Sequence, residues 1–133
     1  MSVSSSYIKK CIFELQELTE KDRPYTRLVF SKEFKEARNW LADQFTNLNL
    51  DIKTDYAGNL IGIYRSFNNS SKKVIIGSHL DTVPFGGRFD GIAGVVSSLA
   101  IIKNFREKKI ELPFDIELYD YLGEELNDWG ISC

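Results

Sequence analysis

The sequence contains a single histidine, two cysteines, one methionine and three prolines among its 133 residues. Its two cysteines, Cys11 and Cys133, lie at opposite ends, belong to no CxxC pair and are too few for a disulfide scaffold. No apolar run approaches the roughly 20 residues that cross a bilayer. The first ten residues also lack the apolar segment of a secretory signal. These absences favour a reduced, cytoplasmic protein without a membrane partner.

Neither sign of charge dominates the chain. Seventeen Lys and Arg stand against 19 Asp and Glu, which gives a formal net charge of −2. The basic residues do not gather into a stripe, so nucleic acid is not an expected partner. With 43% hydrophobic and 27% charged residues, the composition is typical of a globular protein. The length suffices for one domain.

Apolar spacing predicts both helices and strands. We expect helices, from apolar residues three and four apart, over residues 4–19, 31–48 and 91–106. We expect strands over residues 50–54, 60–64, 74–77 and 114–119. The apolar run 74–77 is typical of a central strand covered on both faces. Together with the following helix and strand it predicts a parallel βαβ unit, and therefore an α/β fold.

The polar residues of interest follow the ends of these predicted elements. His79 and Asp81 come at the carboxyl end of one strand, and Asp90 comes at the start of the crossover helix. Glu124 and Glu125 follow the carboxyl end of the next strand. In open α/β sheets these ends meet at one edge, where ligands bind. We therefore expect the five side chains to converge.

Their chemistry suits a divalent metal. Imidazole nitrogen and carboxylate oxygen are zinc ligands, so His79, Asp90 and Glu125 are candidate metal residues, and a carboxylate such as Asp90 can bridge two ions. Asp81, two residues from His79 on an extended backbone, can orient the imidazole. Glu124 is then free to act as general base on a metal-bound water. Catalytic roles are thus predicted for Glu124 and Asp81.

Each of these residues also has a purely structural interpretation. A lone histidine beside an aspartate is often structural, and an adjacent glutamate pair usually belongs to a solvated face. Asp90 could serve as a helix cap and nothing more. A glycine-rich loop before a helix can also cradle phosphate. The stretch GGRFDGIAG, residues 86–94, lacks the Lys-Ser/Thr of a P-loop, however, and Asp90 places negative charge where phosphate would bind.

Several segments carry a family resemblance. GSHLDTVPFGGRFDGIAGV, residues 77–95, strongly resembles the His-x-Asp motif and following loop of the zinc-dependent amidohydrolases of the aminoacylase and carboxypeptidase clan. Within that clan it is similar to the carbamoylase branch, which includes N-carbamoyl-L-amino-acid hydrolases, β-ureidopropionase and allantoate amidohydrolase. YLGEELNDWGISC, residues 121–133, resembles the Glu-Glu motif of that branch. TRLVFS (26–31) and DYAGNLIG (55–62) resemble its upstream segments.

The resemblance implies a role for each residue. His79 would bind one metal ion, Asp90 would bridge two, and Glu125 would bind the other. Glu124 would be the general base, with Asp81 supporting His79. The two divalent ions would be zinc, or manganese or cobalt. The reaction would hydrolyse a carbamoyl (ureido) or amide C–N bond of a small amino-acid-like molecule.

The resemblance also implies the surroundings of the site. The fold would be a partial three-layer α/β/α sandwich with a mixed, mainly parallel sheet, and the peptide bond after Asp90 would be cis. Residues 1–133 would be the N-terminal portion of a metallohydrolase catalytic domain. In the family, two further histidine ligands and a lid that forms a homodimer come from later in the chain, and both are absent here.

Three functions therefore remain open. The chain is either part of a longer amidohydrolase, a truncated remnant with at most weak metal binding and no catalysis, or a metallopeptidase of the same clan. An isolated copy would have one imidazole, whereas catalytic zinc sites normally use three protein ligands. We therefore expect the chain to be inactive by itself.

Overall fold

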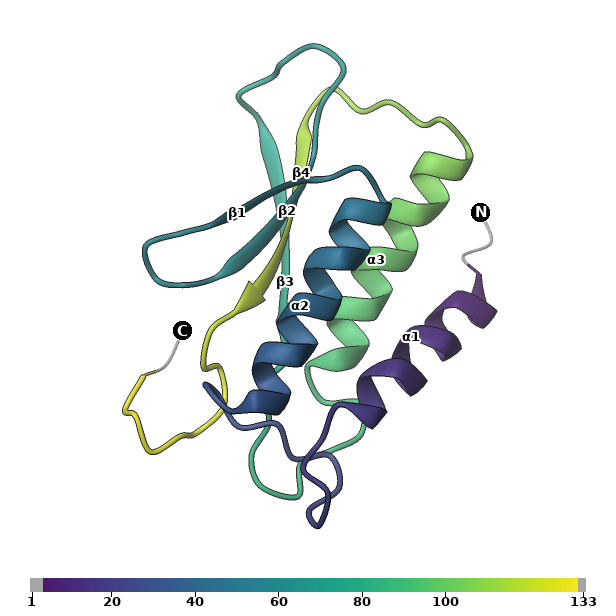
Figure 1. The fold of residues 1–133 in the computed structure, drawn as a ribbon. Coiled ribbons are helices and arrows are strands. Elements are labelled where there is room, and N and C mark those ends of the chain that lie inside the picture. The colour runs from purple at the N-terminus through teal and green to yellow at the C-terminus, as the bar shows by residue number, and fades with distance from the viewer. Residues whose placement is uncertain (1–3, 132–133) are drawn as a thin grey trace.

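The computed structural model describes residues 4–131 (Figure 1). Every element predicted from the sequence is present, with ends that shift by a few residues. In chain order the elements are α1 (Ser5–Glu17), α2 (Lys32–Asn47), β1 (Asp51–Thr54), β2 (Leu60–Tyr64), β3 (Lys73–His79), α3 (Ile92–Glu107) and β4 (Asp115–Tyr121). The α/β class predicted from the sequence is confirmed.

The first two helices begin at serine caps. The Ser4 hydroxyl accepts a hydrogen bond from the backbone N–H of Tyr7, and the Ser31 hydroxyl accepts one from Phe34. A serine at this position satisfies an amide that the helix leaves without a partner. The buried face of α2 then follows at intervals of three and four residues, with Phe34, Ala37, Leu41 and Phe45.

The four strands form one mixed sheet in the order β1-β2-β4-β3. β3 and β4 are parallel, as the predicted βαβ unit requires. The pairs β1–β2 and β2–β4 are antiparallel, so the expectation of a mainly parallel sheet is wrong. The reason is the hairpin: β2 returns antiparallel to β1 and then lies between β1 and β4, where it also runs against β4.

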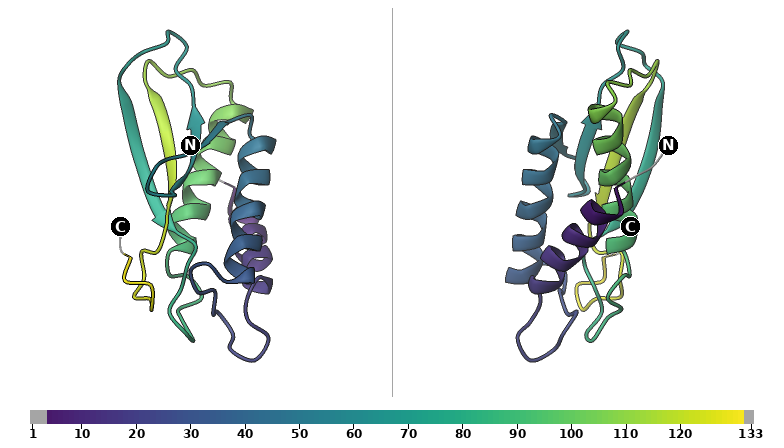
Figure 2. Two further views of the ribbon diagram at one scale, coloured as in Figure 1. Left: turned by 60° about the vertical axis from the view of Figure 1, so that its left-hand side comes forward. Right: turned by 90° about the vertical axis from the view of Figure 1, so that its right-hand side faces the viewer.

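The helices of the described chain cover one face of the sheet (Figure 2). Residues 4–131 therefore provide two layers of the expected three-layer sandwich. Close packing between the layers depends on Gly62, because a Cβ there would lie 2.7 Å from the ring of Phe45 on α2. The core between the layers includes Leu15 of α1, Leu41 of α2 and Leu99 of α3, each essentially inaccessible to solvent.

β3 is an edge strand. Within residues 4–131 it pairs only with β4, and the side chains of Val74 and Ile75 are 44% and 50% exposed. The expectation that the run 74–77 is a central strand covered on both faces is therefore wrong. An apolar run indicates that a strand suits a buried position, but it does not tell which segment covers the strand.

The sheet face away from the helices carries charges. Glu117 of β4 lies between a lysine of β1 and a lysine of β3, with its carboxylate 3.6 Å from Lys53 Nζ and 3.2 Å from Lys73 Nζ. The Tyr119 hydroxyl donates to the same carboxylate. These contacts lower the pKa of Glu117 against the opposing effect of burial. Within the described part of the chain we find no helix with the length and apolar character of a membrane span.

Candidate metal centre

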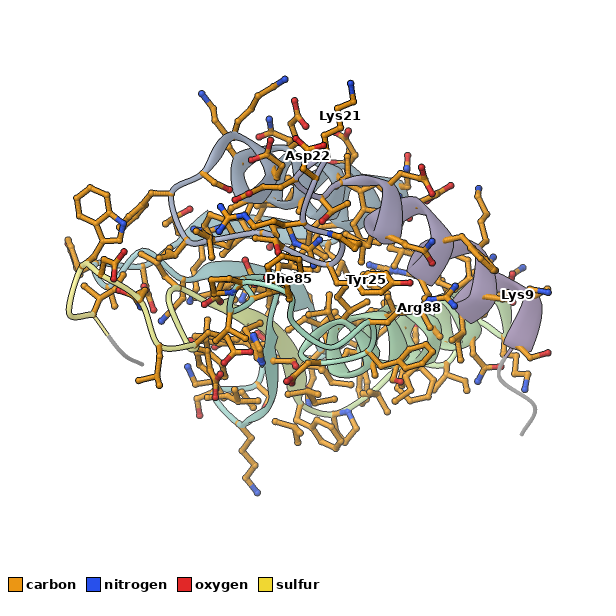
Figure 3. All side chains as sticks on the ribbon, turned by 90° about the horizontal axis from the view of Figure 1, so that it is seen from below. Lys9, Lys21, Asp22, Tyr25, Phe85 and Arg88 are labelled. Carbon is orange, nitrogen blue, oxygen red and sulfur yellow. The ribbon has the colours of Figure 1, made fainter. Side chains whose placement is uncertain are left out.

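The parallel pair β3–β4 brings the candidate residues to one edge. His79 is the last residue of β3 and pairs in register with Tyr121, the last residue of β4. Glu124 and Glu125 follow in the next turn, and Asp90 precedes α3. Figure 3 shows the molecule from the side of the surrounding loops, with Tyr25, Phe85 and Arg88 labelled.

The imidazole of His79 faces carboxylates. Its Nε2 lies 3.4 Å from an oxygen of Glu124 and 3.8 Å from an oxygen of Asp90. One ligand atom each from His79, Glu124 and Glu125 fall within 4.8 Å of one another. His79 is 8% exposed, whereas the side chains of Asp90 and Glu124 are 62% and 44% exposed. The predicted convergence is therefore confirmed, and the site opens to solvent on its carboxylate side.

These groups fit a divalent metal by type and spacing. Ligands at the zinc distances of about 2.0–2.2 Å stand about 3.4 Å apart around a tetrahedral ion. The separations of 3.4 and 3.8 Å from Nε2 agree with that spacing. The pKa of Glu125 is raised by burial and then by the negative charge of Asp90, with His79 opposing the shift. A cation would relieve the repulsion among these carboxylates.

The two glutamates are not distinguished by this geometry. The closest group of three contains both Glu124 and Glu125, while Asp90 stands slightly farther from the imidazole. Either glutamate is within reach of an ion beside Nε2. Their separate roles as base and ligand therefore remain predictions.

The Asp81 backbone, rather than its carboxylate, makes the close contact with the imidazole. His79 Nδ1 lies 3.0 Å from the carbonyl oxygen of Asp81 and 3.7 Å from its carboxylate. A carbonyl only accepts, so Nδ1 carries the proton and Nε2 presents its lone pair to the site. The Asp81 carboxylate instead accepts the backbone N–H groups of Glu124 at 3.4 Å and Glu125 at 3.0 Å.

Gly91 allows α3 to begin against the histidine. Its φ is +63°, and a Cβ there would lie 2.3 Å from the His79 carbonyl oxygen and 2.7 Å from the imidazole. The Ser78 hydroxyl donates to the Gly91 carbonyl at 2.7 Å. Residues 4–131 contain no cis peptide bond, so the cis bond expected after Asp90 is not present.

Two buried charges near the site were not predicted. Arg27 is 1% exposed, and burial lowers its pKa to about 10. Asp120 is inaccessible to solvent, and burial raises its pKa to about 7 although Arg38 Nε lies 3.2 Å away. The sequence does carry a signal for Asp120, because it occupies the same face of β4 as Ile116 and Leu118.

Comparison with known proteins decides the family. No family model matches the sequence. The chain is 30% identical over 132 residues to a ureidoglycolate hydrolase of Oryza sativa subsp. japonica, covering 98% of this chain and 27% of that protein. It is 32% identical over 126 residues to an N-carbamoyl-L-amino-acid amidohydrolase of Pseudomonas sp. (strain NS671), covering 94% and 30%.

Solved structures agree. A crystal structure of a hydantoinase/carbamoylase family amidase from Burkholderia ambifaria matches with a TM-score of 0.88 at 25% identity, over 92% of this chain and 30% of that one. The chain belongs to the carbamoylase branch of the amidohydrolases. The resemblance drawn from the sequence motifs is thus confirmed. This carbamoylase-branch chain spans less than a third of the length of these relatives.

Proposed function

We propose that residues 1–133 are the N-terminal portion of the catalytic domain of a metal-dependent amidohydrolase. The enzyme would hydrolyse a carbamoyl (ureido) or amide C–N bond in a small amino-acid-like substrate. The observation that carries the proposal is that carboxylates from two other segments lie beside His79. One ligand atom each from His79, Glu124 and Glu125 lie within 4.8 Å of one another. The names of the relatives, which include hydrolases of ureido and carbamoyl compounds, support the substrate class.

Each residue has a defined task in this proposal. His79, Asp90 and Glu125 would hold two divalent ions, zinc or else manganese or cobalt, with Asp90 shared between them. When bound, such ions make water acidic enough to attack at neutral pH and polarise the carbonyl. Glu124 would accept the proton of the attacking water and pass it to the leaving nitrogen. Asp81 would position both glutamates through their backbone N–H groups.

A second candidate is a remnant that binds metal weakly and does not turn over. The single histidine of the sequence supports this alternative, because the two further histidine ligands that the family resemblance implies are not among residues 1–133. Under the first proposal the missing ligands come from polypeptide beyond these residues. The complete enzyme would be a homodimer acting in the cytoplasm.

Metal titration tests the proposal and separates it from the alternative. Zinc or manganese would be added during calorimetry to residues 1–133 within the longer polypeptide that the first proposal requires, and ammonia release from N-carbamoyl amino acids and ureidoglycolate would be measured in parallel. Tight binding of two ions with ammonia release supports the hydrolase. Weak binding without release favours the remnant, and no binding at all contradicts both.

Replacing each of the two glutamates by glutamine tests their roles. In an active preparation, Glu124→Gln should abolish turnover and leave the metal content unchanged, whereas Glu125→Gln should lower the metal content. The matched pair differs only in position, so a reversed outcome would reverse the assignment.

A further inference from the structure

Arg27 connects three segments beneath the candidate site. Its Nε donates to the carbonyl of Leu80 at 2.6 Å. Its Nη1 donates to the carbonyls of Leu18 at 2.8 Å and Leu15 at 3.2 Å, at the end of α1. Leu80 lies between His79 and Asp81 in the chain. The guanidinium therefore binds the backbone between the imidazole of His79 and the Asp81 carbonyl that accepts its hydrogen bond.

The backbone of Arg27 adds a second connection to the same segment. Its N–H donates to the Thr82 hydroxyl at 2.7 Å, and its carbonyl accepts from the Thr82 N–H at 3.0 Å. Thr26 extends the connection, because its hydroxyl accepts from the Phe85 N–H at 2.8 Å. The loop after α1 and the loop after β3 therefore lie side by side at the lower end of the molecule (Figure 2).

The segment after His79 depends on these contacts. The β3–β4 ladder ends at the pair His79–Tyr121, so Leu80, Asp81 and Thr82 lie beyond it. Arg27 supplies the donor to the Leu80 carbonyl, the backbone N–H that donates to the Thr82 hydroxyl, and the carbonyl that accepts the Thr82 N–H. Without them, the carbonyl of Leu80 would be buried without a donor, since Leu80 is inaccessible to solvent.

An arginine suits this position because one side chain must donate in several directions. Its planar guanidinium reaches carbonyls of α1 and of the segment after β3 at once, which a single ammonium on a lysine does not. Its positive charge also faces Asp81 and Asp120, and both carboxylates favour the charged form against burial. Arg27 therefore remains a cation under acidic site residues at neutral pH.

We propose that Arg27 is a positioning residue for the metal centre: by fixing the backbone of Leu80, it sets the hydrogen bond from His79 Nδ1 to the Asp81 carbonyl and so directs Nε2 toward the carboxylates. The inference rests on the proposed function for its consequence, and on the hydrogen bonds of Arg27 for its mechanism. Arg27 touches neither substrate nor metal in this role.

The single histidine of the chain provides a direct test. In a ¹⁵N-labelled sample the imidazole nitrogens belong to His79 alone, so their chemical shifts report which ring nitrogen carries the proton. The natural chain should show the Nδ1–H form. Arg27→Lys should give a mixture of tautomers and weaken zinc binding by about tenfold or more, the size seen when groups that orient metal ligands are removed.

Two matched variants distinguish positioning from stability. Arg106→Lys makes the same change at an arginine that donates to the backbone carbonyls of Leu48 and Asn49, at the opposite end of α3. Leu41→Ala destabilises the core without contacting the site. Both should keep the natural tautomer and zinc affinity in their folded fractions.

The outcomes are separable from those of the proposed function. The tautomer is read without metal, so it tests Arg27 even if the natural chain binds no zinc. If Arg27→Lys does not fold, Thr82→Val removes the hydroxyl that accepts the Arg27 N–H and should shift the tautomer in the same direction. An unchanged Nδ1–H signal in whichever of these variants folds would overturn the proposal.

Discussion

The Asp81 carboxylate holds the backbone of Glu125, with Oδ2 accepting the Glu125 N–H at 3.0 Å. Its other oxygen lies 3.4 Å from the Glu124 nitrogen. Asp81 follows β3 and is 1% exposed. Its buried carboxylate therefore fixes the turn that follows β4. The two halves of the candidate site are therefore joined by hydrogen bonds before any ion is present.

Replacing Asp81 should loosen the turn that carries the glutamates. Asp81→Ala leaves both backbone N–H groups without their acceptor, a loss of about 1–3 kcal/mol, so the amides of Glu124 and Glu125 should exchange with solvent roughly ten to a hundred times faster. Hydrogen exchange followed by NMR measures this. Asp115→Ala is the control, because Asp115 accepts the Ser66 N–H at the opposite end of β4. Unchanged protection of Glu125 in Asp81→Ala would contradict the prediction.

A methyl group at Gly91 should damage both fold and site. Gly91→Ala combines a left-handed φ of +63° with a Cβ 2.3 Å from the His79 carbonyl, and should lower the free energy of unfolding by more than about 3 kcal/mol. Gly130→Ala is a matched control, because φ is +67° there and no atom lies within 4 Å of the added Cβ. It should cost only about 1 kcal/mol. Denaturant titration compares them, and equal losses would show that the contact with His79 is unimportant.

The buried Asp120 should make stability fall as pH rises. Its pKa is about 7 in the folded protein and near the ordinary 3.8 when unfolded, so the folded state binds an extra proton between these values. Stability from this group is complete below about pH 4 and is lost as pH rises to about 7, by up to ~4 kcal/mol. Asp120→Asn should therefore gain stability relative to the natural chain across this window.

An aspartate with the opposite shift gives the control for Asp120. The Ser66 N–H and Arg65 hold the pKa of Asp115 below its ordinary value, with burial opposing them. Relative to the natural chain, Asp115→Asn should therefore lose stability as pH rises through the carboxylate range, while Asp120→Asn should gain stability. Urea unfolding at a series of pH values measures both. Parallel curves for Asp120→Asn and the natural chain would show that Asp120 is ionised in both states.

The open edge of β3 should promote self-association. Val74 and Ile75 expose apolar surface beside an edge that has no strand partner in residues 4–131, and such edges pair with other chains. Ile75→Lys should reduce association, because a lysine on an edge strand disfavours pairing. Sedimentation velocity at increasing concentration measures it, with Phe67→Lys as a control at an exposed loop residue. Equal association of both variants would place the contact elsewhere.

Local sequence patterns predicted the positions of the helices and strands. The helix predicted over residues 31–48 is α2, which Ser31 caps, and the strands predicted over 50–54 and 60–64 are β1 and β2, with Gly58 in the turn between them. The site residues were found because βαβ connectivity brings the carboxyl ends of two parallel strands together, whatever the rest of the sheet does. His79 and Glu124 are 45 positions apart in the chain, yet this rule sufficed.

Local sequence patterns could not predict which distant strands pair or which charged residues are buried. No local pattern shows that Leu60 of β2 pairs with Asp120 of β4, or that β3 lies at an edge. Asp81 was expected to orient the imidazole, but the sequence could not tell that its carbonyl makes this contact while its carboxylate binds the turn after β4. Arg27 reads in sequence as a surface residue, and only the carbonyls gathered around it explain its burial.

One strand carries both His79 and the open edge. β4 holds β3 on one side, and the hydrogen bond from Ser78 to Gly91 holds its end against the start of α3, whereas the other side of β3 has no strand partner within residues 4–131. A strand that paired along this open side would therefore bond to the same backbone that carries the imidazole. The shift of the lone imidazole signal would report such pairing, because the sheet edge and the candidate site share one strand.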